Sequence, residues 1–206
     1  MKLIAHRRNT IADLRTTNPK YGVEVDIRSH GPHLVIHHDP FVNGERFEEW
    51  INAYHHGTLI LNVKEEGLEA RLIALMQAKG INDYFFLDQS FPFLVKWSKV
   101  GERRCAVRVS EFESIDTALS LAGKVDWVWV DCFTHFPLSN DDARQLKQAG
   151  FKLCLVSPEL QGRDAEVEIP QMAAMLNERN IEADAICTKR TDLWEKMVAK
   201  KTLSTQ

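Results

Sequence analysis

The feature that most constrains the fold is a regular alternation of short apolar runs and amphipathic stretches along the chain. The runs typical of strands are residues 3–6, 22–28, 59–64, 84–88, 105–109, 127–131, 152–156 and 183–188. Residues 68–79, 141–148 and 169–176 have helical spacing, and Gly80 and Gly150 follow the first two as stop signals. A further extended segment, 33–38, either pairs with the second strand as a hairpin or lengthens the loop. The alternation predicts parallel strands joined by right-handed crossovers.

Two α/β architectures satisfy this alternation, an open doubly wound sheet and a closed barrel. An open sheet usually carries a glycine-rich first turn, whereas the first turn here reads His6-Arg7-Arg8-Asn9-Thr10. Polar residues instead recur where strands end: His6, Asp26, Lys64, Asp88, Arg108 and Asp131. In a barrel these ends meet on one face, where barrel active sites lie. We therefore predict a single compact (β/α)8 TIM barrel over residues 1–206.

Amino-acid composition limits which binding partners and which cellular location we expect. The chain has 206 residues, 44% hydrophobic and 27% charged, with a formal net charge of -3, which argues against nucleic acid as a partner. No apolar run is long enough to insert into a membrane, and the first residues lack a secretory signal, so a cytoplasmic location is expected. The oligomeric state is left open. Cys105, Cys132, Cys154 and Cys187 lie apart in apolar runs, which predicts buried, reduced, structural thiols.

The densest group of reactive side chains lies in the first 64 residues. Glu24 and Asp26 are two apart on one strand, so both carboxylates face the same way and would repel without a cation between them. Hard oxygen ligands suit Mg2+ or Ca2+. Histidines on separate segments can act as general acid and base, and Arg and Lys can bind phosphate oxygens. This combination predicts a site that cleaves a phosphodiester.

Four short motifs occur in order: His6-Arg7, Glu24-Val25-Asp26, His38-Asp39 and Asn62-Val63-Lys64. They resemble the HR, ExD, HD and ExK motifs of the glycerophosphodiester phosphodiesterase family, which are phospholipase-C-like TIM barrels. The segment Gln89-Ser90-Phe91 also matches one that is common there.

The resemblance implies a role for each matched residue. His6 and His38 would be the acid/base pair, Glu24, Asp26 and Asn62 would hold one divalent metal ion, and Arg7 and Lys64 would bind the phosphate. It also implies attack by the neighbouring glycerol hydroxyl, which forms a cyclic phosphate that water then opens. The enzyme would be a phosphoric diester hydrolase with a small phosphodiester as its substrate.

The chain departs from the family pattern at two places. Arg8 stands where a glycine usually follows HR, and only Asn9-Thr10 remains of the usual ENT segment. Asn62 replaces the carboxylate of ExK, which removes one negative charge from the ligand set and should weaken metal binding. Asp88 or Asp131, at the ends of later strands, would be positioned to supply the missing negative charge.

Several residues keep more than one interpretation. Arg108 either binds phosphate or pairs with Asp88 or Glu111, and Asp131 is a ligand, a substrate contact or a helix cap. We retain both as candidate substrate-binding residues. His37 alternates with His38 and is expected to be structural.

Two alternative functions remain beside phosphodiester hydrolysis. One is a degenerate barrel that binds a phosphorylated ligand without turnover, which Asn62 favours and the retained His6 and His38 oppose. The other is a sugar-phosphate isomerase or lyase, which predicts either a Schiff-base lysine buried in an apolar strand or a glycine-rich phosphate loop after the seventh and eighth strands. Ser157-Pro158-Glu159 and Thr188-Lys189-Arg190 contain no such glycines.

Overall fold

The computed structural model describes the backbone of residues 1–204 and the side chains of residues 1–199. The chain forms two compact units, one of Met1–Ala5 with the chain from Val107 onwards, and one of His6–Ala106.

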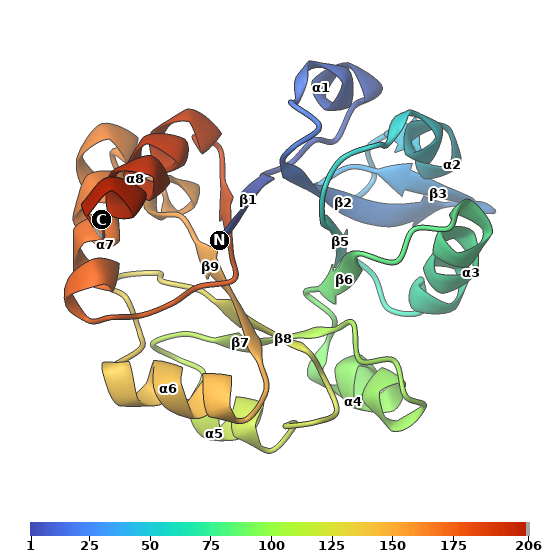
Figure 1. The fold of residues 1–206 in the computed structure, drawn as a ribbon. Coiled ribbons are helices and arrows are strands. Elements are labelled where there is room, and N and C mark those ends of the chain that lie inside the picture. Colours follow the sequence, from blue (N-terminus) through green and yellow to red (C-terminus); the bar gives the residue numbers. More distant parts are fainter. Residues whose placement is uncertain (205–206) are drawn as a thin grey trace. The chain divides into compact units, whose positions relative to one another are not determined.

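The unit His6–Ala106 contains a sheet with helices between its strands (Figure 1). Its elements are α1 (Ile11–Thr16), β2 (Gly22–His30), β3 (His33–Ile36), β4 (Glu45–Arg46), α2 (Phe47–Trp50), the 3-10 helix η1 (Ile51–Ala53), β5 (Leu59–Val63), α3 (Glu69–Lys79), β6 (Tyr84–Leu87) and α4 (Phe91–Lys99). Strand β2 pairs in parallel with β5, and β5 pairs in parallel with β6. Strand β3 pairs antiparallel with β2, so the extra extended segment forms a hairpin arm.

The second unit repeats the alternation of strand and helix (Figure 1). It contains β1 (Lys2–Ala5), β7 (Ala106–Val109, from its second residue), α5 (Ile115–Leu119), β8 (Trp127–Val130), α6 (Asn140–Gln148), β9 (Lys152–Val156), the 3-10 helix η2 (Pro158–Gln161), α7 (Ala165–Glu178), β10 (Ala185–Thr188) and α8 (Thr191–Ser204). Strands β1, β10, β9 and β8 pair in parallel in that order.

The strands β1, β2, β5, β6, β7, β8, β9 and β10 alternate with helical segments in the described chain, which confirms the predicted fold class. Most element boundaries lie within one or two residues of the predicted ones. Helix α7 is longer than predicted because Asp164 caps its start, accepting hydrogen bonds from the backbone of Glu166 and Val167. The extent of one domain over residues 1–206 stays a prediction.

The interiors of both units are apolar, as parallel strands with helices on their outer faces require. Val23, Val25 and Ile27 of β2 are fully buried, as are Leu153 and Leu155 of β9. The four cysteines are buried and free, which confirms their predicted structural role. None of the helices in the described part of the chain combines the length and apolar character needed to cross a bilayer.

Candidate active site in the unit His6–Ala106

The site is organised by the register of β2 against β5. Asp26 lies opposite Asn62 in this register, and Glu24 lies two residues earlier on the same face of β2. Both carboxylates are fully buried, and Asn62 is also buried. Two buried carboxylates among apolar neighbours destabilise the fold unless hydrogen-bond donors or cations contact them, and both carboxylates here have such contacts.

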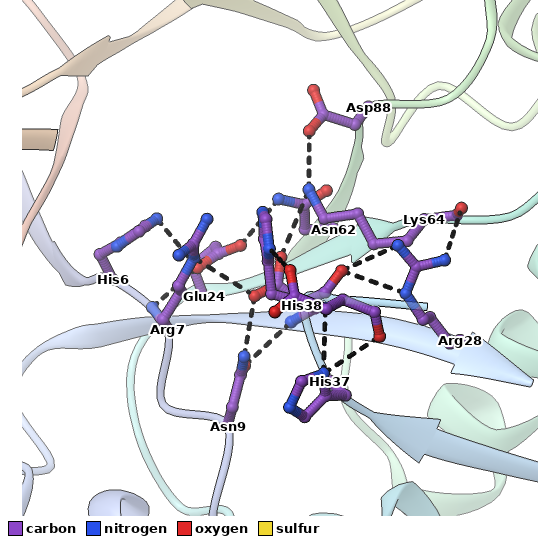
Figure 2. A network of polar contacts seen from close by, with 12 residues as sticks. His6, Arg7, Asn9, Glu24, Arg28, His37, His38, Asn62, Lys64 and Asp88 are labelled. Atoms are coloured by element: carbon purple, nitrogen blue, oxygen red, sulfur yellow. Dashed lines mark hydrogen bonds and ion pairs between the residues drawn. The ribbon is translucent and has the colours of Figure 1, made fainter. Parts of the chain in front are cut away.

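Glu24 is held by one neutral amide and by the backbone that follows β1. Asn62 Nδ2 donates to Glu24 Oε1 at 2.9 Å, and the Arg7 backbone N–H donates to Oε2 at 2.7 Å. His6 Nε2 lies 3.7 Å from the same Oε2 (Figure 2). Burial, followed by the charge of Asp26, raises the pKa of Glu24 to about 7, although the two hydrogen bonds oppose the shift. A cation bound beside Glu24 would oppose this shift and favour the ionised carboxylate.

Asp26 is surrounded by cations and by a second amide. Asn9 Nδ2 donates to Asp26 Oδ2 at 2.8 Å, and Asn9 Oδ1 accepts the Asp26 backbone N–H at 3.0 Å. Arg7 Nε lies 3.5 Å from Oδ2, and Lys64 Nζ lies 3.3 Å from Oδ1. Asn9 was not among the predicted site residues, although its place in the reduced ENT segment was a signal for it.

Lys64 links Asp26 to the end of β6. Its Nζ donates to Asp88 Oδ2 at 3.1 Å, and its side chain is only 15% exposed (Figure 2). Asp88 follows β6 with a φ of 60°, and Arg7 follows β1 with a φ of 50°. Non-glycine residues rarely adopt this left-handed region, and such strain is often concentrated at functional sites.

His38 lies in the loop after β3 and is partly exposed. Its Nδ1 lies 2.7 Å from Asp39 Oδ1, and this hydrogen bond lowers the pKa of Asp39. Arg28 Nη2 and Nε both donate to the His38 carbonyl, at 2.8 and 3.1 Å, and so hold the loop (Figure 2). Arg28 extends the face of Glu24 and Asp26 by the same two-residue period, which was the signal for it.

His37 contributes to the loop rather than to the carboxylate network. Its Nδ1 accepts the Asp39 backbone N–H at 2.9 Å (Figure 2). This contact agrees with the structural role predicted from the alternation of His37 and His38.

The donor set of Glu24, Asp26 and Asn62 fits one hard divalent cation. Asn62 Oδ1 is buried and accepts no hydrogen bond, and Asp26 Oδ1 contacts the Lys64 ammonium at 3.3 Å without accepting a hydrogen bond, so both oxygens could serve as ligands beside the Glu24 carboxylate. Two carboxylates and an amide oxygen are ligands that Mg2+ and Ca2+ accept. Within the described chain, no group of three His, Cys, Asp or Glu side chains is arranged to hold a metal, so Asp88 does not complete a third carboxylate.

The remaining predicted residues, Arg108 and Asp131, lie at strand ends of the other unit and contact each other. Arg108 Nη1 lies 3.2 Å from Asp131 Oδ2. Asp131 Oδ1 accepts from Gln161 Nε2 at 2.7 Å and from the Cys132 backbone N–H at 3.0 Å. Arg108 therefore pairs with Asp131, a partner that was not considered from sequence, and a contact with substrate stays a prediction.

Comparison with known proteins adds information on the fold. No protein-family model and no curated protein matches the chain. A solved glycerophosphodiester phosphodiesterase from Agrobacterium tumefaciens str. C58 matches with a TM-score of 0.65 and 17% identity, over 96% of this chain and 99% of that one. A solved glycerophosphoryl diester phosphodiesterase from Parabacteroides distasonis ATCC 8503 matches with a TM-score of 0.67 and 12% identity, over 97% and 86%. The resemblance predicted from the motifs is therefore confirmed at the level of the fold.

Proposed function

We propose that this chain is a metal-dependent phosphoric diester hydrolase that acts on a glycerophosphodiester or a similar small phosphodiester. The observation that carries the proposal is the fully buried pair Glu24 and Asp26 on one face of β2. The fold shared with two proteins named as glycerophosphodiester phosphodiesterases supports the same reaction class.

Arg7 and Lys64 would bind the substrate phosphate. Both lie within 3.5 Å of an Asp26 carboxylate oxygen, so the buried carboxylate holds two cations beside the strand ends. Arg presents a planar set of donors and Lys a point charge, and both match non-bridging phosphate oxygens. Their charge would also stabilise the negative charge that increases on the phosphoryl oxygens in the transition state.

His6 and His38 would exchange protons with the reacting oxygens. When His38 Nδ1 donates to Asp39, Nε2 remains the nitrogen that can accept or donate the transferred proton. His6 Nε2 lies 3.7 Å from the Glu24 carboxylate, at the end of the strand that precedes the proposed phosphate site. One ring would take the proton of the attacking glycerol hydroxyl while the other protonates the leaving alcohol, and their roles reverse when water opens the cyclic phosphate.

Glu24, Asp26 and Asn62 are the residues that would hold the metal ion. When bound, a divalent cation supplies Lewis-acid polarisation of the phosphoryl oxygen and lowers the pKa of the attacking hydroxyl. Asn9 and the Arg7 backbone would keep the two carboxylates oriented through the hydrogen bonds they donate.

A second candidate function is binding of a phosphorylated ligand without turnover. The specific observation in its favour is Asn62, a neutral amide hydrogen-bonded to Glu24 where the family motif has a carboxylate. A pure binding protein has no need for paired histidines, so we rank hydrolysis first.

The deciding experiment measures hydrolysis of glycerophosphocholine, glycerophosphoethanolamine and bis(p-nitrophenyl) phosphate with Mg2+, Ca2+ or Mn2+. We expect turnover that falls by about a thousandfold in His6→Ala and in His38→Ala, because each removes a proton-transfer group. His30→Ala is the matched control, because His30 is exposed on the turn of the β2–β3 hairpin. Binding of a phosphorylated ligand without turnover of any ester, whichever metal is added, would favour the second candidate.

A further inference from the structure

A cavity of about 290 Å³ lies beside the carboxylate network, within the unit His6–Ala106. Its lining includes Lys64, Asp88, Gln89 and Ser90, together with Glu69 from the first turn of α3. Lys64 and Asp88 also belong to the network in Figure 2. The cavity therefore shares a border with the proposed phosphate-binding group.

Three buried polar atoms of the lining have no hydrogen-bond partner: Glu69 Oε2, Gln89 Oε1 and Ser90 Oγ. Glu69 is fully buried, and its other oxygen, Oε1, accepts from Gln89 Nε2 at 3.0 Å. Because that bond turns the Gln89 amide nitrogen towards Glu69, the amide oxygen is left as an acceptor. Ser90 precedes α4 but its side chain makes no capping hydrogen bond, so its hydroxyl is available too.

Three unsatisfied polar atoms in one buried cavity lower the stability of the folded protein unless a bound molecule supplies their hydrogen bonds. A buried carboxylate oxygen without a donor loses its hydration without compensation, and buried polar atoms are nearly always satisfied. The missing partner must be rich in donors, since all three atoms can accept. The partner should also be a cation, because the lining is acidic. It contains one basic residue, Lys64, and four acidic residues, Glu65, Glu66, Glu69 and Asp88.

We propose that this cavity binds the primary ammonium group of the alcohol that leaves the phosphodiester, as in an ethanolamine ester. A primary ammonium carries three N–H donors and one positive charge, which match three acceptors in an acidic cavity. A trimethylammonium group carries the same charge but no N–H, so it cannot satisfy these atoms. The proposal rests on the proposed function, because Lys64 on the border is assigned there to the phosphate.

The test compares kcat/KM for glycerophosphoethanolamine with kcat/KM for glycerophosphocholine. We expect the native protein to favour the ethanolamine ester, and Glu69→Gln to reduce that ratio about tenfold, since one charged hydrogen bond is lost. Gln89→Met removes the second acceptor at similar size and should reduce the ratio as well. Glu49→Gln, an exposed site on α2, is the matched control and should leave the ratio unchanged.

A second measurement needs no turnover. Ethanolammonium chloride and choline chloride are titrated into the protein, and NMR shifts of the Gln89 side-chain amide are followed. We expect saturable shifts with ethanolammonium that Glu69→Gln weakens, and none with choline.

The outcomes separate the two proposals. Without hydrolysis of any ester the proposed function fails, while the titration still decides whether the cavity binds a primary ammonium. With hydrolysis, an unchanged ratio in both folded variants and no shift with ethanolammonium would overturn the inference, and the cavity would then hold water. Circular dichroism verifies folding, and Gln89→Met decides if Glu69→Gln does not fold.

Discussion

The two units of this chain differ in whether their buried polar groups have hydrogen-bond partners. Among the described side chains, the buried polar atoms that lack a hydrogen-bond partner all lie in the unit His6–Ala106, including those of Asp26, Asn62 and Glu69. In the other unit, the buried polar groups Asp131 and Ser157, which follow strands, are satisfied by donors of the same unit. Asp131 accepts from Gln161 and Cys132, and Ser157 Oγ accepts from Trp194 Nε1 at 2.8 Å.

Backbone strain follows the same division. Within the described backbone, the non-glycine residues with positive φ are Arg7, Phe41, Asp88 and Asn180, and all but Asn180 lie in His6–Ala106. Arg7 and Asp88 both belong to the carboxylate network. Strained residues and unsatisfied polar atoms both lower the stability of a folded chain, and such features are often concentrated at functional sites, so this unit is the one in which to test for ligand binding.

The largest effect on stability and activity is expected for the loss of Lys64, the cation beside Asp26. Lys64→Met should destabilise the protein by about 3 kcal/mol, because it leaves a buried carboxylate with less compensation, and should also remove measurable activity. Urea unfolding and ester hydrolysis measure the two effects. Lys99→Met, at an exposed position on α4, is the control. A native-like free energy of unfolding for Lys64→Met would mean that Arg7 and Asn9 suffice to hold Asp26.

The second prediction concerns the amide in the proposed metal site. Asn62→Glu adds a third carboxylate beside Glu24 and Asp26, so the metal-free protein should melt at a lower temperature while Ca2+ or Mg2+ binds about tenfold more tightly. Calorimetric titration and melting curves with metal or with chelator measure both. Asn62→Gln keeps the amide and controls for side-chain size. Unchanged affinity in Asn62→Glu would show that residue 62 does not contact the ion.

The third prediction concerns acid stability in the other unit. Glu111 accepts backbone N–H groups of Phe133, Thr134 and His135, and although burial raises its pKa, the hydrogen bonds led by that of His135 lower the pKa to about 2. A depressed pKa means that the stabilisation is present above the ordinary value of 4.5 and is lost as the pH falls towards 2. Glu111→Gln should therefore cost about 1 kcal/mol at pH 7 and much less near pH 2.

Urea unfolding at both pH values measures this difference, with exposed Glu178→Gln as the control. An equal cost of Glu111→Gln at the two pH values would show that the carboxylate charge does not hold the loop.

The smallest effect on stability is expected for Arg108→Met. Asp131 keeps the donors of Gln161 and Cys132 after this change, so the free energy of unfolding should fall by less than about 1 kcal/mol. A several-fold rise in KM with little change in stability would support the predicted substrate contact. Unchanged KM would show that Arg108 does not contribute to substrate binding.

Much of the site was predictable because strand periodicity is a local property. Glu24 and Asp26 share a face of β2 for that reason, and the polar residues at the ends of β1 and β5 supply His6, Arg7, Asn62 and Lys64. Asn9 and Asp39 stand in motifs that the sequence showed, but their hydrogen bonds were not predicted, because loop conformation decides them. Glu69 was not predicted at all, because the placement of a helix brings it to the cavity and no spacing rule in the sequence reports such a contact.

The amino-acid sequence alone determined the alternation of strands and helices, the face on which the carboxylates lie, and the loss of a charge at Asn62. Those properties depend on residue type and on backbone period, which neighbours along the chain define. Only the tertiary structure decided which donors hold each carboxylate oxygen, which strand ends meet, and that Glu69 keeps an unsatisfied oxygen in a cavity. Hydrogen bonds and burial depend on distances between segments far apart in the chain, and those distances exist only once the chain has folded.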